Sequence, residues 1–275
     1  NDLASGLKNN KTNTIGLIIP TIWHPFFSEM AFHVEQVLQK RGYKLLLCNS
    51  NGCEDSEIQY LQMLRKNMID GIIAISYSDI EVYINSNLPF VSIDRKFDKN
   101  INFVASQNYE GGLLAAETLF SKGCKELLYV GSHNKFMNAT MDRRRGFEDF
   151  CRDKKISFHI IDILEPYEGF DDEIYAIFEE NPGIDGIFTI NDFVGMDAIE
   201  TLKAIGKEVL VDYQLIGFDG IKLSEERSYM VSTIVQDVEE IATRSVDILL
   251  KNIEDENYYA NSYVKVRFEE GGTTK

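Results

Sequence analysis

Short aliphatic runs alternate along the chain with longer segments in which apolar residues recur every three or four positions. Residues 15–19 form an aliphatic run that stops at Pro20, whereas the segment after Pro25 carries one apolar helical face, made of Phe27, Met30, Ala31, Val34, Val37 and Leu38. The first pattern predicts a buried strand and the second an amphipathic helix. Because the two patterns keep alternating, the sequence predicts parallel sheets covered by helices.

The same patterns, separated by clusters of Gly, Pro, Asn and Asp, place elements along the whole chain. We predict strands at residues 15–19, 43–48, 71–75, 89–94, 127–130, 158–163, 186–190, 215–218, 231–235 and 264–268. We predict helices after Pro25 and at residues 54–67, 109–121, 143–152, 171–179, 193–205 and 238–249. The elements complete two open α/β sheets with some to spare, so we expect the chain to cross back between two lobes, with a ligand cleft at the carboxyl ends of the strands.

Composition narrows the class of protein. The chain has 275 residues, with 28 Lys and Arg against 44 Asp and Glu, which gives a net charge of −16. A chain this acidic is repelled by phosphate backbones, so we do not expect it to hold DNA by itself. No apolar run approaches the roughly 18 residues of a membrane span, and no membrane partner is expected. The four cysteines, Cys48, Cys53, Cys124 and Cys151, lack paired metal or redox spacing, which favours reduced structural thiols and a cytoplasmic location.

Catalytic motifs are missing from the sequence. There is no Gly-x-Ser-x-Gly elbow, no Gly-x-Gly-x-x-Gly after a strand, no phosphate loop and no His-Glu-x-x-His. The four histidines, His24, His33, His133 and His159, are scattered and are interpreted as surface or packing residues. We therefore expect a protein that is not an enzyme and that has no cofactor and no metal site.

Several short motifs occur in a fixed order along nearly the whole chain. They are Thr12-x-Thr14-Ile15-Gly16-Leu17-Ile18-Ile19-Pro20 with Pro25-Phe26-Phe27, Arg41-Gly42-Tyr43, Asp70-Gly71-Ile72-Ile73, Pro89-Phe90-Val91-Ser92-Ile93-Asp94-Arg95, Asn108-Tyr109-Glu110-Gly111-Gly112, Arg143-x-x-Gly146-Phe147, Thr189-Ile190-Asn191-Asp192, Ile216-Gly217-Phe218-Asp219, and the final Arg267 to Thr274 segment. Together they resemble the core of the lactose/galactose repressor (LacI/GalR) family. The resemblance implies an α/β protein with two Rossmann-like lobes, parallel sheets and three crossovers, the periplasmic-binding-protein-like type I fold.

The resemblance also implies a division of the chain. Residues 1–12 would be the remnant of a hinge helix and linker, 13–122 with 235–259 the N-terminal lobe, and 123–234 with 260–275 the C-terminal lobe. The family's helix-turn-helix DNA-binding domain would be absent from this chain. Ala4 and Leu7 match the hinge helix, with Leu7 at the position that wedges into the operator minor groove. A disordered segment is the alternative interpretation of these first residues.

Polar effector-binding residues are expected at strand ends and at one helix start. Arg143, in the Arg-x-x-Gly-Phe pattern, matches the guanidinium that grips the effector, and a surface arginine is the alternative. Asn191 and Asp219 follow two strands and match hydroxyl-binding positions, and ordinary helix capping is the alternative for Asn191. Asp94, also at a strand end, is either an effector ligand or a structural residue.

Aromatic side chains complete the expected effector site. Phe26 and Phe27 begin the first helix, where one can stack on the ligand while the other joins the core, and we favour Phe27 as the ligand-facing ring. Trp23 lies in the preceding loop and suits either loop packing or stacking. Tyr167 belongs to a loop that often brings an aromatic ring into the cleft in similar proteins.

The function implied by the resemblance is a ligand-responsive transcriptional regulator, a repressor whose core binds a small sugar or sugar phosphate between its lobes. It would form a homodimer and bind operator DNA through the missing headpiece, with effector binding changing DNA affinity allosterically. The alternatives are an exported sugar-binding protein of a transport system, an α/β enzyme, and a regulator whose co-repressor is a phosphorylated carrier protein.

Overall fold

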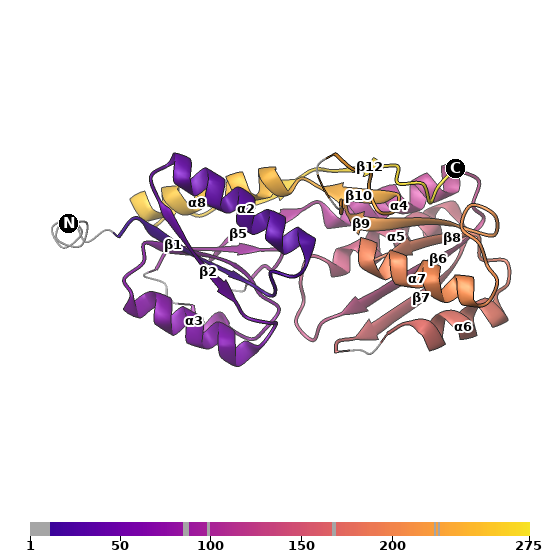
Figure 1. Cartoon of the computed structure of the whole chain (residues 1–275), viewed down its shortest axis with the longest axis horizontal. Helices are drawn as coiled ribbons and strands as arrows, with labels where there is room; N and C mark the ends of the chain where they lie inside the picture. The colour runs from indigo at the N-terminus through magenta and orange to yellow at the C-terminus, as the bar shows by residue number, and fades with distance from the viewer. Residues whose placement is uncertain (1–11, 85–87, 98–99, 167–168, 223, 225) are drawn as a thin grey trace. The chain divides into compact units, whose positions relative to one another are not determined.

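The computed structural model describes residues 12–84, 88–97, 100–166, 169–222, 224 and 226–275, so the predictions for Ala4, Leu7 and Tyr167 lie outside the described residues. The chain divides into two compact units, each with its own sheet (Figure 1). Unit 1 comprises Asn1–Ser106 and Asp237–Val264, and unit 2 comprises Gln107–Gln236 and Lys265–Lys275. The chain therefore passes between the units three times, as predicted.

Unit 1 is built on a parallel sheet with the strand order β11-β5-β4-β3-β1-β2. Its strands are β1 (Thr14–Ile19), β2 (Lys44–Asn49), β3 (Gly71–Ile75), β4 (Phe90–Ile93), β5 (Asn102–Ser106) and β11 (Asn261–Val264). Helices α2 (Pro25–Lys40) and α8 (Val238–Glu254) share one apolar core with the sheet, and α3 (Glu54–Lys66) belongs to a second core (Figure 1). A short 3₁₀ turn, η1, covers Glu81–Tyr83.

Unit 2 repeats the architecture with the strand order β12-β10-β9-β8-β6-β7. Its strands are β6 (Glu126–His133), β7 (Ser157–Leu164), β8 (Gly186–Thr189), β9 (Gln214–Asp219), β10 (Thr233–Gln236) and β12 (Val266–Glu269), of which only β12 pairs antiparallel, with β10, among the described pairings. Its helices are α4 (Asn108–Ser121), α5 (Met141–Lys154), α6 (Asp171–Glu180) and α7 (Asp192–Ala204). The predicted pair of α/β lobes with largely parallel sheets is confirmed.

Two details of the strand prediction are wrong. The final strand expected at residues 264–268 is two strands, β11 and β12, which belong to different sheets and are separated only by Lys265. Strand β5 was not predicted, although all five of its residues are buried. Its sequence, Asn-Phe-Val-Ala-Ser, has too few aliphatic residues to form the run that marks a buried strand.

The crossovers also differ from the predicted lobe boundaries. The chain leaves unit 1 after Ser106, not after residue 122, so α4 belongs to unit 2. The second and third crossings follow Gln236 and Val264, close to the expected positions after residues 234 and 259. The large displacement of the first crossing arises because α4 packs directly on α5, and the apolar face of a helix does not reveal which sheet it will cover.

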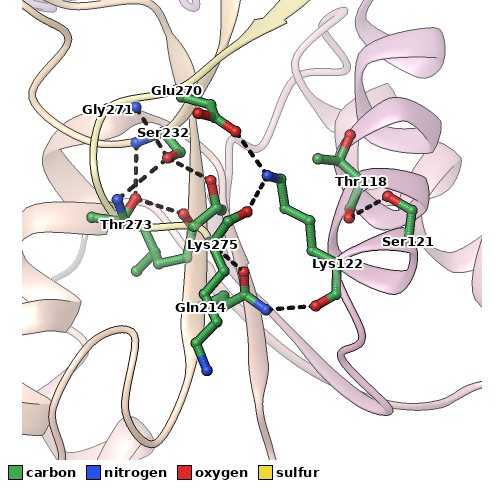
Figure 2. Close-up of polar contacts among 11 residues, drawn as sticks. Thr118, Ser121, Lys122, Gln214, Ser232, Glu270, Gly271, Thr273 and Lys275 are labelled. Carbon is green, nitrogen blue, oxygen red and sulfur yellow. Dashed lines mark hydrogen bonds and ion pairs between the residues drawn. The ribbon is translucent and has the colours of Figure 1, made fainter.

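The segment after β12 is held in unit 2 by hydrogen bonds (Figure 2). The Gln214 amide donates to the carbonyl oxygen of Lys122 (3.1 Å) and accepts from the backbone N–H of Lys275 (2.8 Å). The backbone N–H of Ser232 donates to the Thr273 hydroxyl (2.8 Å), which in turn donates to the carbonyl oxygen of Leu215 (2.7 Å). The last residues of the chain are thus part of the structure of unit 2 and not a free tail.

Among the described residues, no helix combines the length and the apolar character that crossing a membrane requires.

Candidate functional site

Three polar side chains follow neighbouring strands of unit 2 at the point where each strand ends. Asn191 lies two residues beyond β8, Asp219 is the last residue of β9 and Gln236 is the last residue of β10. Because these strands are parallel neighbours, their carboxyl ends lie at one edge of the sheet. Open α/β sheets bind ligands at this edge, so the structure makes it the candidate site.

Arg143 brings a buried guanidinium to this edge from the first turn of α5. Its side chain is only 4% exposed, which excludes the surface-arginine interpretation. Its Nε donates to Oδ1 of Asn108 (2.7 Å), and its Nη1 donates to the carbonyl oxygen of Ile190 (2.6 Å) and lies 3.4 Å from Oδ1 of Asp219. The guanidinium carbon is 3.7 Å from the centre of the Phe218 ring, a cation–π contact. The guanidinium is therefore fixed in orientation by its neighbours.

Glycines explain why α5 can deliver Arg143 so close to α4. A Cβ atom at Gly112 would lie 1.9 Å from the carbonyl oxygen of Arg143, and one at Gly146 would lie 2.0 Å from the carbonyl oxygen of Tyr109. The two helices therefore approach backbone to backbone, which only glycine permits. This contact is the physical reason for Gly112 and Gly146 in the two motifs, whereas a Cβ atom at Gly111 would meet the Phe218 ring at 2.6 Å.

Asp219 is a buried carboxylate held in an unusual backbone conformation. Its φ of +107° lies in the region that L-residues rarely adopt, and Gly220 follows with φ +79°. Its Oδ1 accepts from Nε2 of Gln236 (2.8 Å) as well as facing Arg143. Burial raises the pKa of Asp219 to about 6, and the opposing effects of Arg143 and Gln236 are too small to cancel the rise. The carboxylate can accept hydrogen bonds from hydroxyl groups once it is ionised.

Asp192 is a second buried acid at this edge and was not predicted from the sequence. Its Oδ2 accepts from the backbone N–H of Ile221 (2.7 Å), so it anchors the turn that follows Asp219. Burial and the nearby charge of Asp219 hold the pKa of Asp192 well above its ordinary value. The charge of Asp219 thus already disfavours ionisation of a second carboxyl group at this edge, which makes the edge unfavourable for additional negative charge.

Asn191 caps a helix, as the alternative interpretation of this residue proposed. Its Oδ1 accepts from the backbone N–H of Val194 (2.9 Å) at the start of α7, and its side chain is half-buried. The cap leaves the amide nitrogen as the group of this side chain that can donate to a ligand.

In unit 1, the structure separates the three aromatic candidates near the end of β1. Phe26 is 5% exposed and belongs to the core, whereas Phe27 is half-buried and packs against His24, with 5.2 Å between ring centres. Trp23 is 93% exposed. Burial lowers the pKa of His24 to about 4, so its ring is neutral at physiological pH. His24 therefore joins Phe27 as an uncharged surface at this strand end.

Asp94 and Arg95 are buried just beyond the end of β4. Asp94 is 1% exposed, has φ +61°, and its backbone N–H donates to the carbonyl oxygen of Val104 (3.0 Å). Arg95 stacks over the ring of Phe97 at 4.6 Å and donates to the carbonyl oxygen of Ser78. Arg95 was not predicted as a site residue, and these contacts hold its guanidinium within unit 1.

A buried glutamate near the same edge was also missed. Glu57 on α3 is 1% exposed and accepts hydrogen bonds from the hydroxyls of Ser50 (3.4 Å) and Ser76, each of which directly follows a strand. Burial raises the pKa of Glu57, and the serine hydroxyls and the charge of Arg95 oppose that rise. The periodicity of α3 did not predict that Glu57 is buried, because a single acidic residue on an apolar helix face has no distinctive sequence pattern.

The sequence analysis named Arg143 and Asp219 as candidates but not Asn108 and Gln236, the residues that form hydrogen bonds with them. Asn108 begins the Asn-Tyr-x-Gly-Gly motif, and this position was the available signal. Gln236 ends a strand as Asp219 does, so the strand-end argument applied to Asp219 could have identified it.

Metal and thiol chemistry find no support in the part of the chain that the structure describes. No group of three or more His, Cys, Asp or Glu side chains there could hold a metal ion. The four cysteines are free thiols, and Cys48, Cys124 and Cys151 are buried. Burial raises the pKa of Cys48 to about 11 and those of Cys124 and Cys151 to about 12, so these three thiols are unreactive.

The chain is similar to known proteins over most of its length. A family model described as periplasmic binding proteins and sugar binding domain of LacI family matches residues 12–255. The ribose operon repressor of Halalkalibacterium halodurans is 33% identical over 253 residues, which cover 92% of this chain and 76% of that protein.

Two solved structures are similar in both fold and sequence. A periplasmic binding protein/LacI transcriptional regulator from Alkaliphilus metalliredigens, complexed with D-xylulofuranose, has a TM-score of 0.81 and 30% identity, covering 96% of this chain and 99% of that one. A LacI family transcriptional regulator from Enterococcus faecalis, with bound ribose, has a TM-score of 0.77 and 26% identity, covering 95% and 98% of the two chains.

Proposed function

The chain belongs to the family of periplasmic binding proteins and LacI sugar-binding domains, and on this premise we propose that it binds a neutral pentose as the effector of a transcriptional repressor. The relatives make it a ligand-binding regulator of transcription, neither an exported binding protein nor an enzyme, as the sequence predicted. The step beyond the family is the class of effector and the residues that hold it.

The Arg143–Asp219 pair carries this proposal. A sugar presents hydroxyl groups that donate and accept at the same time, and the pair offers a fixed donor fork beside a carboxylate acceptor. Both side chains are less than a tenth exposed, so hydrogen bonds made there are protected from competition with bulk water.

The balance of charge favours a neutral sugar over a sugar phosphate. Arg143 faces Asp219, and the charge of Asp219 raises the pKa of the neighbouring Asp192. A phosphate group would add negative charge where the buried carboxyls already repel one another. The similar structures from Alkaliphilus and Enterococcus contain xylulofuranose and ribose, which supports the choice of a pentose.

Other site residues remain predictions within this proposal. We assign Phe27 as an apolar face for the sugar ring, with Phe26, Trp23, Asp94, Tyr167 and Asn191 as further candidates from the sequence. We also predict that residues of unit 1 and unit 2 bind the same effector.

The decisive experiment compares three alanine variants. We expect D-ribose to raise the melting temperature of the wild-type chain, and Arg143→Ala and Asp219→Ala to weaken ribose binding at least about tenfold in calorimetry, because each loses charge-assisted hydrogen bonds. Arg145→Ala is the matched control, since Arg145 is exposed and pairs only with Asp142 among the described ion pairs. D-Xylulose and sucrose test the size of the sugar. Equal ribose affinity in all three variants would contradict the assignment.

DNA binding, dimerisation and location follow from the role of a repressor. We propose that the protein acts in the cytoplasm as a homodimer and binds operator DNA through a headpiece joined near Ala4 and Leu7. Sedimentation of the purified chain measures the oligomeric state. In a protein that carries a headpiece, operator binding should be sensitive to salt and changed by ribose.

A further inference from the structure

Unit 1 contains a cavity of about 420 Å³ at the edge of its sheet where the strands begin. Phe90 and Asn102, the first residues of β4 and β5, line this cavity together with Asn252 in the last turn of α8. Because β4 and β5 are parallel, their carboxyl ends, near Asp94 and Ser106, lie at the opposite edge. The volume is in the range of small-molecule sites in proteins. The cavity is therefore separate from the candidate effector site.

The floor of the cavity presents a hydrogen-bond acceptor without a partner. Asn252 is only 8% exposed, and its amide nitrogen donates to the carbonyl oxygens of Asp255 (3.4 Å) and Tyr258 (3.2 Å), which fixes the orientation of the side chain. Its Oδ1 accepts no hydrogen bond from the described residues. A nearly buried acceptor of this kind favours a ligand that brings a donor.

The charge around the cavity is negative. Among the described residues that line it, Glu256 alone is charged at neutral pH, and none is Lys, Arg or His. The cavity also lies at the C-terminus of α8, where unpaired carbonyl groups give a helix a partial negative charge. Lys251 is the basic residue of this last turn, and it is outnumbered by Glu254, Asp255 and Glu256. A cation is therefore attracted to the cavity and an anion is repelled.

Two tyrosines complete the cavity wall. Tyr258 and Tyr259 both line it, and the Tyr259 side chain is exposed. Nζ of Lys251 lies 5.6 Å from the centre of the Tyr258 ring, so this ring already attracts one cation. The ring of Tyr259 offers a similar surface to a ligand, and Ile84 and Leu88 offer apolar surface to the hydrocarbon part of that ligand.

We propose that this cavity binds an organic ammonium ion that has an apolar body. The ammonium group donates to Oδ1 of Asn252 and is attracted by the Glu256 carboxylate, the Tyr259 ring and the end of α8. The body packs on the apolar part of the floor, next to Phe90. The inference does not rest on the identity of the effector, because none of these residues belongs to the candidate effector site.

The test compares ligands that share a phenyl ring and differ in charge. The probes are 2-phenylethylamine, its uncharged analogue 2-phenylethanol and the anion 3-phenylpropionate. NMR titration of the backbone amides of the isotope-labelled chain measures the affinity and the location of each. We expect the amine to bind at least about tenfold more tightly than the alcohol, because the helix end, the aromatic ring and the carboxylate each favour a cation. The carboxylate probe should bind more weakly than the alcohol.

The titration also reports where the amine binds. Its chemical-shift changes should be confined to amides around the cavity, such as those of Ile101, Asn257 and Tyr259. Saturating D-ribose should leave the affinity for the amine unchanged, because the proposed effector site lies elsewhere.

Two substitutions with matched controls test the residues. Glu256→Gln should weaken amine binding about fivefold and leave 2-phenylethanol binding unchanged, whereas Glu254→Gln, outside the cavity lining, should change either affinity less than about twofold. Tyr259→Leu keeps an apolar surface and should weaken amine binding about threefold. Tyr263→Leu is its control, since Tyr263 is an exposed tyrosine on β11 that does not line the cavity. All four side chains are exposed, so the variants should fold.

The outcomes are distinct. A preference for the amine that falls in the Glu256 and Tyr259 variants and is kept in both controls supports the inference. Equal affinity for the amine and the alcohol, tighter binding of 3-phenylpropionate, shifts away from the cavity, displacement by ribose, or the same affinity in all variants overturns it. Ribose binding measured without the amine tests the proposed function separately, so either conclusion can fail while the other stands.

Discussion

The two units bury acidic side chains at the same edge of their sheets, but they stabilise them differently. In unit 1, Glu57 accepts hydrogen bonds from serine hydroxyls, and Arg95 is turned toward Phe97 and a backbone carbonyl. In unit 2, Asp219 faces the guanidinium of Arg143 and accepts from Gln236. Glu57 and its serine partners form a structural cluster. In unit 2, by contrast, the charged donor Arg143 lies beside the acceptor Asp219.

The comparison shows how one architecture serves two purposes. The carboxyl ends of the strands provide a packed polar cluster in unit 1 and a candidate recognition pair in unit 2. Packing differs as well: in unit 2 two helices meet through glycine backbones, whereas the tight glycine at the start of β3 in unit 1, Gly71, faces the flexible side chain of Leu249. Rigid backbone contact fixes the position of Arg143, so unit 2 should be the less tolerant of change.

We expect the largest effect from substituting the tightly packed glycines of the two units. Gly146→Ala forces a methyl group against the carbonyl oxygen of Tyr109, and we expect the free energy of unfolding to fall by about 3 kcal/mol. Gly71→Ala meets only the Leu249 side chain, 2.9 Å from the new Cβ atom, and should lower it by about 1 kcal/mol. Urea denaturation of both variants measures the difference. Equal losses would show that backbone contact between α4 and α5 is not a special constraint.

Substitutions of the two adjacent phenylalanines of unit 1 test whether Phe26 belongs to the core and Phe27 to the ligand-binding surface. Phe26→Ala removes a buried ring and should lower the free energy of unfolding by about 3 kcal/mol, with little effect on ribose affinity at a temperature where the variant is folded. Phe27→Ala removes a half-buried ring and should lower stability by only about 1 kcal/mol while weakening ribose binding about tenfold. Thermal denaturation and calorimetry provide the two readouts. The reverse pattern would move the ligand surface to Phe26.

The raised pKa of Asp219 predicts opposite pH dependences for binding and stability. Between pH 7 and pH 5 the carboxylate becomes protonated, so ribose affinity should fall about tenfold. Because the folded-state pKa of about 6 is above the ordinary value of 3.8, folding favours the protonated form. The contribution of Asp219 to the free energy of unfolding should therefore rise by about 1 kcal/mol over the same interval.

Asp219→Asn isolates the contribution of this residue from those of the other titratable groups, including its neighbour Asp192. We expect the difference in the free energy of unfolding between the wild type and Asp219→Asn to change by about 1 kcal/mol between pH 7 and pH 5. Urea denaturation at the two pH values measures it. A difference that does not vary with pH would place the pKa of Asp219 outside this interval.

The smallest expected effect concerns the buried acid of unit 1. Glu57→Gln keeps an acceptor and replaces the other oxygen with a donor that a rotated serine hydroxyl can accept, so stability at pH 7 should change by less than about 1 kcal/mol. Ribose affinity should not change. A loss of more than about 2 kcal/mol would instead show that Arg95 depends on an ionised Glu57 as its buried counter-charge.

The accuracy of the sequence predictions follows the range of the interactions concerned. The strand at residues 71–75 was located correctly because an aliphatic run between turn residues is a local pattern. The unit to which α4 belongs was predicted wrongly, because it depends on a glycine contact with α5. For the candidate site, motifs named Arg143 and Asp219 as candidates, whereas Asn108 and Gln236 were not named because only their hydrogen-bond partners connect them with this pair.

The amino-acid sequence by itself determined the alternation of strands and helices, the family resemblance and the central candidates of the effector site. Only the tertiary structure decided which sheet α4 covers, that Phe26 and not Phe27 enters the core, and which groups orient Arg143. The physical reason is separation along the chain: Asn108 and Arg143 are 35 residues apart, and Arg143 and Asp219 are 76 apart. Periodicity shows which face of an element is apolar, but the partner of that face is chosen when distant segments pack together.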